Sequence, residues 1–386
     1  MKDKLHVLII PTWYPNGKDK LMGIYHKVFC KALANSGKVS TNMIYIYRQG
    51  MSLAYKYPFM KKYTVDNCDG YDVYIKKMLD ITKFGFDRQM KAYTRALEKL
   101  FLRYVKKFGY PDVIHAQTIL AAGYAASVIG KKYSIPVVVT EHASYFESFF
   151  TGNKEKYARF VAENASVNCV GKYMCDILKT KYSVDCEVLP NIADTATFSL
   201  PKAESDGVFR LLTVSGLRPG KCVDNTVKAL KLLRDRGEIG DFEFTVVGDG
   251  EMEESYKKTT SDLSMDDKVK FVGRKTPEEV SEYLSKSDAL VIASDIETFG
   301  IPAVEALASG TPVICTKCKG PEGFLDGECA EFCEVNDVED LARAIKNMYL
   351  RKGSFDPDLL RKKAREFSSE SVADKAIGIY KRILEK

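Results

Sequence analysis

The sequence lacks several features by which protein classes are usually recognised. It contains one tryptophan and four histidines among 386 residues. No run approaches the ~20 consecutive apolar residues that a membrane-spanning helix needs. The first residues, MKDKLHVLIIPTWYP, hold only a short apolar run before a turn, so they predict a first strand and not a secretion signal. The hydrophobic content of 45% excludes a disordered or collagen-like chain, and the length predicts two domains.

The ten cysteines predict free thiols in a reducing cytoplasm, because no secretion signal accompanies them. Four of them have a paired spacing that is also found in zinc sites, namely Cys315, Cys318, Cys329 and Cys333. We do not expect zinc there. Cys315 ends a segment that reads as a buried strand, and a structural zinc site needs four sulfurs that converge on one point.

Charge is unevenly distributed along the chain. Residues 1–200 contain 29 basic and 17 acidic residues, a net charge of +12, whereas the remainder contains 29 and 35, a net charge of −6. The basic half predicts a negatively charged partner, which leaves nucleic acid, an anionic membrane and a phosphate-bearing substrate open. Residues 83–107 predict a helix with one apolar and one basic side. Such a helix either packs on a core, which we favour here, or lies on an anionic membrane.

Short apolar segments alternate with helix-like segments in both halves. The predicted strands are 5–10, 42–47, 112–116, 136–140 and 166–170, and then 209–214, 242–247, 269–272, 289–293 and 312–315. The alternation predicts two doubly wound α/β domains with parallel sheets. Residues 189–207 read as their connection. Ligands of such sheets bind outside the carboxyl ends of the strands, so we expect the two domains to face one central cleft that holds the site.

The strongest motif spans residues 294–310 and follows a predicted strand. Its loop consists of Glu297, Thr298, Phe299 and Gly300. Pro302 suits the first turn of a helix, whose free amides and positive dipole end favour a phosphate. Glu305 lies about one turn into that helix, where a carboxylate can accept hydrogen bonds from sugar hydroxyls. Taken one at a time, Glu297 and Glu305 are equally compatible with a binding role and with being charges exposed to solvent.

Two further loops follow predicted strands. Arg218 and Lys221 flank a Pro-Gly turn after residues 209–214, and this pair of cations can clamp a diphosphate or simply be solvated. The loop after the first strand carries Gly17 and Gly23, which can approach a phosphate or sugar. No G-x-G-x-x-G is present, and Gly248-Asp-Gly250 reads as a plain turn.

Two of the four histidines follow predicted strands. His115 and His142 are therefore expected at carboxyl ends, where an imidazole can contact a sugar hydroxyl or an acceptor. Tyr145, in an aromatic cluster after His142, is a further candidate for the acceptor side. His6 and His26 fall inside a strand and a helix and are expected to be structural.

Taken together, these motifs resemble the retaining GT-B glycosyltransferases of family 4, over nearly the whole chain. The segment ETFGIPAVEALASGTPV resembles the Glu-x7-Glu signature of that family. The resemblance implies two Rossmann-like domains: residues 1–195, with a terminal helix at 370–386 that returns to them, and residues 196–369. Cys222 and Lys319 stand where the family often has glycine, and Arg218 follows a variant of the usual pattern.

The resemblance also implies roles for the candidate residues. Glu305 would hold the ribose, Glu297 the donor sugar, and amides around Phe299 and Gly300 the sugar and diphosphate. Arg218 and Lys221 would stabilise the departing diphosphate, and His142 would contact the transferred sugar. The loop with Gly17 and Gly23 would close over the donor.

The implied activity is transfer of a hexose or N-acetylhexosamine from a nucleotide sugar, UDP-linked by preference with GDP-mannose as a second possibility. The acceptor would be a glycan, by preference a lipid-linked intermediate of bacterial surface polysaccharide synthesis, at the inner membrane face. We expect no metal and no cofactor, since no Asp-x-Asp lies in a suggestive place. A nucleotide-sugar 2-epimerase of the same fold and a non-catalytic sugar-nucleotide-binding subunit remain alternatives. We do not expect nucleic acid as a partner, because the sequence contains no recognisable nucleic-acid-binding module.

Overall fold

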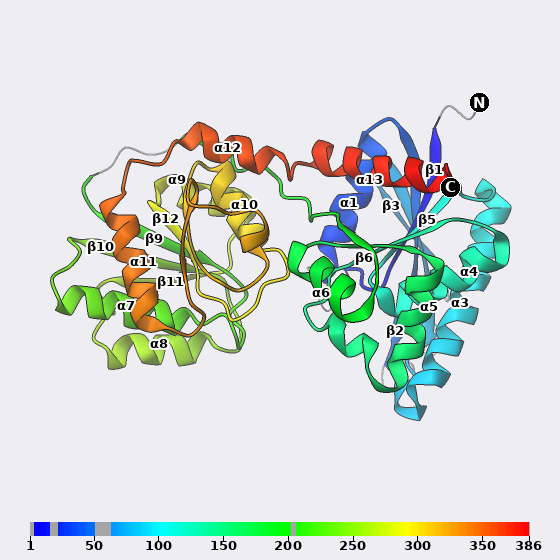
Figure 1. Cartoon of the computed structure of the whole chain (residues 1–386), viewed down its shortest axis with the longest axis horizontal. Helices are drawn as coiled ribbons and strands as arrows, with labels where there is room; N and C mark the ends of the chain where they lie inside the picture. The colour runs from blue at the N-terminus through cyan, green and yellow to red at the C-terminus, as the bar shows by residue number, and fades with distance from the viewer. Residues whose placement is uncertain (1–3, 16–21, 51–62, 202–205, 386) are drawn as a thin grey trace. The chain divides into compact units, whose positions relative to one another are not determined.

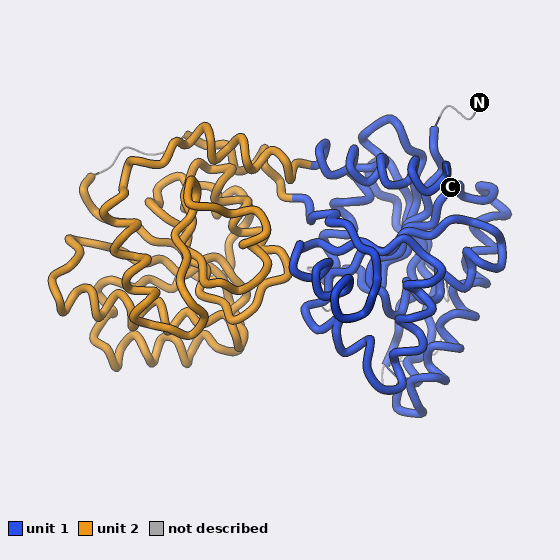
Figure 2. The backbone as a smooth tube through the Cα atoms, in the orientation of Figure 1, with its two compact units in different colours: residues 1–192, 369–386 blue, residues 193–368 orange. Residues whose placement is uncertain are grey.

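The computed structural model describes residues 4–15, 22–50, 63–201 and 206–385. The chain forms two compact units, which Figure 2 colours separately. Unit 1 comprises residues 1–192 and 369–386, and unit 2 comprises residues 193–368. The boundary predicted after residue 195 thus lies a few residues beyond the observed one, and the final helix belongs to the first unit.

Unit 1 is built on an eight-stranded sheet in the order β3-β4-β2-β1-β5-β6-β7-β8 (Figure 1). The strands are β1 (Leu5–Pro11), β2 (Val39–Gln49), β3 (Tyr63–Cys68), β4 (Tyr71–Leu79), β5 (Val113–Gln117), β6 (Val137–Glu141), β7 (Ser166–Cys169) and β8 (Cys186–Val188). Only β3 runs antiparallel to its neighbour. Every residue of β5 and β6 is buried, as expected for strands covered on both faces.

Among the described residues, six α-helices cover this sheet. They are α1 (Ile24–Asn35), α3 (Phe86–Phe108), α4 (Tyr124–Tyr133), α5 (Glu155–Asn164), α6 (Lys172–Tyr182) and α13 (Ser369–Leu384). The apolar side of α3 is buried, including Tyr93, Leu97 and Tyr104, so this helix packs on the core. The core also contains Ala376 and Tyr380 of α13, which ties the end of the chain to unit 1.

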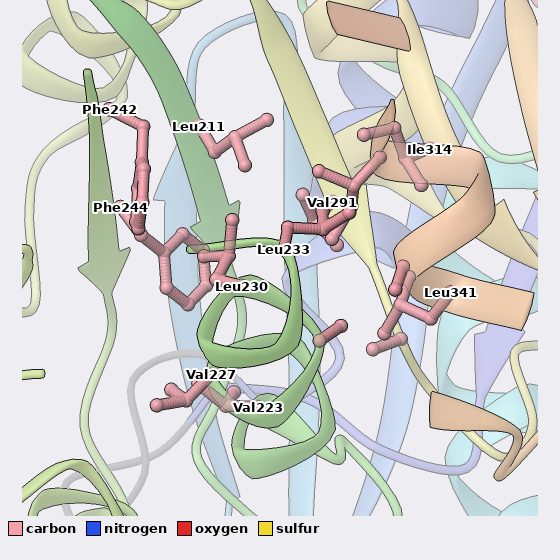
Figure 3. Packing of buried hydrophobic residues seen from close by; sticks show 14 of the residues in the cluster. Leu211, Val223, Val227, Leu230, Leu233, Phe242, Phe244, Val291, Ile314 and Leu341 are labelled. Carbon is pink, nitrogen blue, oxygen red and sulfur yellow. The ribbon is translucent and has the colours of Figure 1, made fainter. Parts of the chain in front are cut away.

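Unit 2 contains a six-stranded parallel sheet in the order β11-β10-β9-β12-β13-β14. The strands are β9 (Phe209–Val214), β10 (Phe242–Val247), β11 (Val269–Gly273), β12 (Ala289–Ile292), β13 (Val313–Thr316) and β14 (Ala330–Cys333). The helices are α7 (Val223–Asp235), α8 (Glu253–Asp262), α9 (Pro277–Lys286), α10 (Ile301–Ala308), α11 (Val338–Leu350) and α12 (Pro357–Arg365). Figure 3 shows Leu230 and Leu233 of α7 packed beside Leu211 and Val291 of the sheet.

In each sheet the strand order reverses beside the first strand of the unit. The first strand β1 lies between β2 and β5, and β9 lies between β10 and β12. Such reversal points open a crevice at the carboxyl ends of the strands, where loops diverge. The loops after β9 and β12 therefore start side by side in unit 2. No helix of the described residues is both long enough and apolar enough to cross a lipid bilayer.

Candidate functional site

The loops after β9 and β12 bring together the lysine and the first glutamate of the predicted site. The Lys221 Nζ donates to Glu297 Oε1 at 2.5 Å, and Ser294 Oγ donates to the same oxygen at 2.8 Å. The side chains of Lys221 and Glu297 are 26% and 19% exposed. A pair of this exposure holds the ammonium in a defined place and leaves it accessible to a ligand. Sequence analysis did not single out Ser294.

The loop that contains Glu297 is fixed by backbone contacts with the loop after β13. The Glu297 N–H donates to the Cys318 carbonyl at 2.8 Å. Gly320 lies so close that a Cβ there would come within 2.7 Å of the Phe299 nitrogen and 2.8 Å of the Glu297 carbonyl oxygen. The close approach of two backbones fixes the conformation of the loop that leads into α10.

Helix α10 begins directly after this loop. Its N-cap, Gly300, has φ 91°, and a Cβ at this position would lie 2.7 Å from Pro321 Cγ. Pro302 lies in the first turn, as predicted. The first N–H groups of a helix have no intrahelical acceptor, and here they follow Gly300 with no side-chain cap. This end of α10 has the character of an anion site.

The remaining loop residues differ in what they offer. Thr298 is half-buried, whereas the Phe299 ring is buried and packs against Phe324 and Phe367, with centroids 5.2 and 5.4 Å away. Phe299 can therefore present only its backbone to a ligand. Glu305, one turn into α10, is half-buried; burial raises the pKa of its carboxyl to about 7, and the Asp194 carboxylate adds to this rise.

The loop after β9 is joined to the loop after β12 through its glycine turn. Gly220 has φ 83°, and its carbonyl accepts a hydrogen bond from the Asp295 N–H at 2.8 Å. Tyr256 donates its hydroxyl to the Arg218 carbonyl at 3.3 Å. The Arg218 side chain is exposed. The turn thus places Arg218 and Lys221 at one end of the sheet, the first free in solvent and the second held by Glu297.

The prediction of a plain turn at Gly248-Asp-Gly250 was wrong. A Cβ on Gly248 would lie 1.8 Å from the Ser215 carbonyl oxygen, and one on Gly250 would lie 2.3 Å from the Leu217 carbonyl oxygen. The Leu217 N–H also donates to the Asp249 carbonyl at 2.8 Å. The two glycines therefore let the loop after β10 support the segment that carries Arg218.

Cys222 and Lys319, at the two positions where the resemblance implies glycine, have the backbone conformation that favours glycine. Their φ angles are 49° and 83°. The Cys222 thiol donates to Asp295 Oδ1 at 3.2 Å, and the Lys319 N–H donates to the Glu322 carboxylate. Both loops therefore keep the positive φ angle typical of glycine although neither position holds a glycine.

In unit 1, His142 follows β6 as predicted. Its Nε2 lies 2.7 Å from Gln117 Oε1, and its ring is 4.8 Å from Tyr25 and 5.1 Å from His26 between centroids. Burial lowers the pKa of His142 to about 3, while the Asn191 side chain opposes the shift. His142 is therefore neutral at physiological pH and suited to hydrogen bonding rather than to carrying charge.

Glu141, which sequence analysis missed, fixes the loop that carries His142. Its carboxylate is fully buried and accepts hydrogen bonds from the backbone N–H groups of Ile119, His142 and Ala143 at 2.7–2.8 Å. Burial raises the pKa of Glu141 to about 7, and the three N–H donors oppose this rise. The only sequence signal was an acidic residue at the end of an apolar strand.

The other candidates of unit 1 differ in placement. His115 is fully buried, with Nδ1 2.7 Å from Tyr380 Oη and Nε2 2.8 Å from Thr140 Oγ1. This geometry corrects the expectation of an acceptor contact, because both ring nitrogens are used within the core and link β5 to α13. Tyr145 is 56% exposed and accessible to a ligand.

The glycine loop after β1 is only partly described. Gly17 lies outside the described residues. Gly23 caps α1 with φ 69°, and a Cβ there would lie 2.6 Å from the Trp13 carbonyl oxygen. The backbone thus requires glycine at this helix start.

The four cysteines of the zinc-like spacing are buried in unit 2, and Cys315 Sγ lies 3.9 Å from Cys318 Sγ. The described residues bring three potential metal ligands together elsewhere, in unit 1. There the sulfurs of Cys169, Cys175 and Cys186 lie within 4.8 Å of one another.

Two family models match successive parts of the chain. The model described as glycosyl transferases group 1 matches residues 196–367, and the model of glycosyltransferase family 4 matches residues 55–197. Together they span most of both units.

Several curated proteins are similar in sequence. An uncharacterized glycosyltransferase of Methanocaldococcus jannaschii, MJ1178, is 28% identical over 71% of this chain and 75% of its own length. The alpha-monoglucosyldiacylglycerol synthase of Streptococcus pneumoniae is 24% identical over 80% of this chain and 74% of its own.

Solved structures share the fold at low identity. The lipopolysaccharide outer core galactosyltransferase WaaB superposes with a TM-score of 0.74 at 15% identity, over 98% of this chain and all of WaaB. Anabaena HepE in complex with UDP superposes with a TM-score of 0.70 at 15% identity, over 98% of this chain and all of HepE. These likenesses show the GT-B fold.

Proposed function

Because the chain belongs to the group 1 glycosyl transferases of family 4, we propose that it transfers a hexose or N-acetylhexosamine from a nucleotide sugar to a glycan acceptor. The observation that carries the proposal is the Lys221–Glu297 pair beside the N-terminus of α10. This pair and the free helix amides place a cation, a carboxylate and an anion site at one sheet edge, which are the groups that a departing diphosphate and a donor sugar require.

The chemistry requires positive charge where the bond to the sugar breaks. As the bond between the anomeric carbon and the diphosphate oxygen lengthens, negative charge grows on the diphosphate. The Lys221 ammonium, the Arg218 guanidinium and the α10 amides stabilise that charge. The acceptor oxygen forms the new bond to the anomeric carbon, and its proton passes to the departing diphosphate. If the acceptor and the diphosphate lie on the same face of the sugar, the configuration at the anomeric carbon is retained.

Glu297 and Glu305 have different tasks in this proposal. Glu297 aligns the Lys221 ammonium before the donor arrives and then accepts hydrogen bonds from the donor sugar. Glu305 accepts hydrogen bonds from the ribose hydroxyls, for which its position one turn into α10 is suitable. In unit 1, neutral His142 hydrogen-bonds the transferred sugar, and the buried Glu141 carboxylate positions it.

For the donor we propose a UDP-sugar first and GDP-mannose second. HepE was solved with UDP, which is consistent with this order. For the acceptor we propose a lipid-linked glycan of a bacterial surface polysaccharide, used at the cytoplasmic face of the membrane. The similarity to a glycolipid synthase and to an outer core galactosyltransferase supports this choice.

The direct test is a thermal-shift series with UDP, GDP and ADP, followed by donor turnover with the nucleotide that stabilises the protein. A ligand at about 100 times its Kd stabilises by ~2.7 kcal/mol. Stabilisation by no nucleotide diphosphate would contradict the proposal. Conversion of the nucleotide sugar to an isomer without any acceptor would instead identify an epimerase, and binding without turnover would identify a binding subunit.

A further inference from the structure

Three cysteines of unit 1 meet in the last β-α-β crossover of its sheet, and we call them the sulfur cluster. They are Cys169 at the end of β7, Cys175 in α6 and Cys186 at the start of β8. Their sulfur atoms all lie within 4.8 Å of one another, and Cys175 Sγ lies 2.7 Å from Cys186 Sγ. The proposed transfer uses none of these side chains.

The strand register explains why the three side chains meet. Strands β7 and β8 are parallel neighbours, with Cys186 opposite Val167. Side chains two residues apart on a strand point to the same face, so Val167, Cys169 and Cys186 share one face of the sheet. Helix α6 connects the two strands and contacts both, which places Cys175 over that face. The cluster is therefore a product of the crossover.

The sulfur cluster reaches the surface at one side. Strand β8 lies at the edge of the sheet, and Cys186 on it is half-buried, whereas Cys169 and Cys175 are buried. Cys186 therefore gives a small reagent from the solvent a point of contact with the cluster.

One of the three sulfurs is prepared as a nucleophile. Hydrogen bonds from the thiols of Cys169 and Cys186 lower the pKa of Cys175 to about 4, against the opposing effect of burial. Cys175 is also the fourth residue of α6, near the positive end of the helix dipole, which stabilises a thiolate. Burial raises the pKa of Cys169, so this thiol stays protonated and remains a donor.

The distances favour a covalent link between two of these sulfurs over a metal ion bound by all three. Two sulfurs on one tetrahedral zinc ion lie about 3.8 Å apart, so Cys175 and Cys186 would have to separate by about 1 Å. A disulfide joins sulfurs about 2.05 Å apart, which requires a closure of only about 0.7 Å. We propose that Cys175 and Cys186 form an oxidative modification site, at which a hydroperoxide converts the two thiols to a disulfide.

The reaction balances with hydrogen peroxide as the oxidant. The Cys175 thiolate attacks one peroxide oxygen, the O–O bond breaks and hydroxide leaves, which gives a sulfenic acid at Cys175. Cys186 Sγ then attacks the Cys175 sulfur, the S–O bond breaks, and the thiol proton leaves with the departing hydroxide as water. The two sulfurs lose two electrons in all, and the peroxide ends as two molecules of water once the first hydroxide is protonated. Cys169 does not enter the new bond and is a positioning residue.

This modification goes beyond the proposed transfer and does not rest on it. The test is treatment of the reduced full chain with hydrogen peroxide, then alkylation of the remaining thiols in denaturant and tryptic digestion without reduction. Trypsin leaves the three cysteines in three different peptides, residues 160–172, 173–179 and 182–202. The expected product joins 173–179 to 182–202 with the loss of two hydrogen atoms. No link, or a link mainly to 160–172, would overturn the proposal.

The chain supplies a matched control pair in Cys315 and Cys318. Their sulfurs lie 3.9 Å apart, and both side chains are fully buried. The hydrogen bond to Cys318, together with burial, raises the pKa of Cys315, so this pair lacks a thiolate. Cys315 should therefore be recovered alkylated after the same treatment. Equal oxidation of both pairs would mean that peroxide links any neighbouring cysteines and would overturn the proposal.

Variants of the third cysteine test its positioning role. The wild-type rate of disulfide formation should change little between about pH 6 and about pH 8, because Cys175 is already a thiolate. C169A should be roughly tenfold slower at about pH 6 and should recover as pH rises, because a donor to the thiolate is lost. C169S keeps a hydroxyl donor and should restore the wild-type pH profile. An unchanged profile in C169A would overturn this role.

Metal analysis of the purified chain tests the competing use of the sulfur cluster. We expect no zinc that depends on Cys175. About one zinc ion per chain in the wild type, lost in C175S, would identify a metal site and overturn the proposal.

Discussion

At the scale of single residues, Lys221 is the cation of the proposed site that an ion pair holds in place. It is held by Glu297, at a sheet edge beside free helix amides. Replacement by alanine should lower donor turnover ~100-fold, the usual loss for one charge-stabilising group, with little change in stability. K228A is the matched control, because Lys228 lies seven residues further along in α7, where it donates to Asp224 and Asn225 of the same helix. Turnover at the wild-type rate in K221A would remove Lys221 from the mechanism.

Glu305 predicts a pH dependence of donor binding. Its pKa of about 7 in the free protein means that it is largely protonated at about pH 6 and largely ionised at about pH 8. The ionised carboxylate is the better acceptor for ribose hydroxyls, so affinity for a nucleotide sugar should rise with pH, by at most about tenfold per pH unit. The diphosphate of a nucleotide sugar is a diester and does not titrate in this range.

The measurement for Glu305 is the Kd of a nucleotide sugar across this pH range for the wild type and E305Q. The amide cannot titrate, so E305Q should bind weakly and with a smaller pH dependence, the remainder coming from Glu141, whose pKa burial also raises to about 7. If E305Q kept the wild-type pH dependence, another group would be responsible.

At the scale of elements, Gly300 sets how α10 begins. Its φ of 91° costs an L-residue about 1–2 kcal/mol, and a Cβ would also meet Pro321 Cγ at 2.7 Å. G300A should therefore lower the free energy of unfolding and weaken nucleotide-diphosphate binding. G237A is the control, because Gly237 has φ 66° but open space around it. G237A should lose a similar free energy of unfolding to backbone strain and should bind the nucleotide diphosphate normally. If G300A also binds the nucleotide diphosphate normally, the anion site assigned to the start of α10 is contradicted.

Most of the parallel strands and the loops after them were predictable because they are short, apolar and bounded by turns, whereas the short parallel strands β8 and β14 were not predicted. Strand β9 was predicted with its observed bounds, and β12 to within one residue. The antiparallel β3–β4 pair was not predicted, because β3 is largely polar, has no buried residue and carries no apolar pattern. The structural roles of Gly248 and Glu141 could not be predicted from the sequence for another reason. Each depends on a backbone from a distant part of the sequence, which no local pattern reveals.

At the scale of the whole chain, the charge asymmetry has a physical counterpart in the two units. Many cations of unit 2 are paired with carboxylates, for example Arg274 with Asp249 and Arg236 with Glu339. In unit 1, six exposed cations of α3 have no carboxylate partner among the described residues, namely Arg88, Lys91, Arg95, Lys99, Arg103 and Lys106. Part of the excess positive charge of the first half therefore lies along one exposed helix face, while other cations of unit 1 are in ion pairs, for example Lys132 with Glu98.

Metal dependence is a property of the chain as a whole, and we expect transfer without a metal. The carboxylates beside the proposed diphosphate position are engaged: Glu297 holds Lys221, and Asp295 accepts a hydrogen bond from the Cys222 thiol. The charge that a divalent cation would neutralise is met by Lys221, Arg218 and the start of α10. Turnover should therefore persist in excess EDTA and should not increase on adding Mn²⁺. The control is the turnover of the same enzyme preparation before EDTA is added. If turnover is lost completely in EDTA and returns with Mn²⁺, Lys221, Arg218 and the start of α10 do not suffice to stabilise the departing diphosphate.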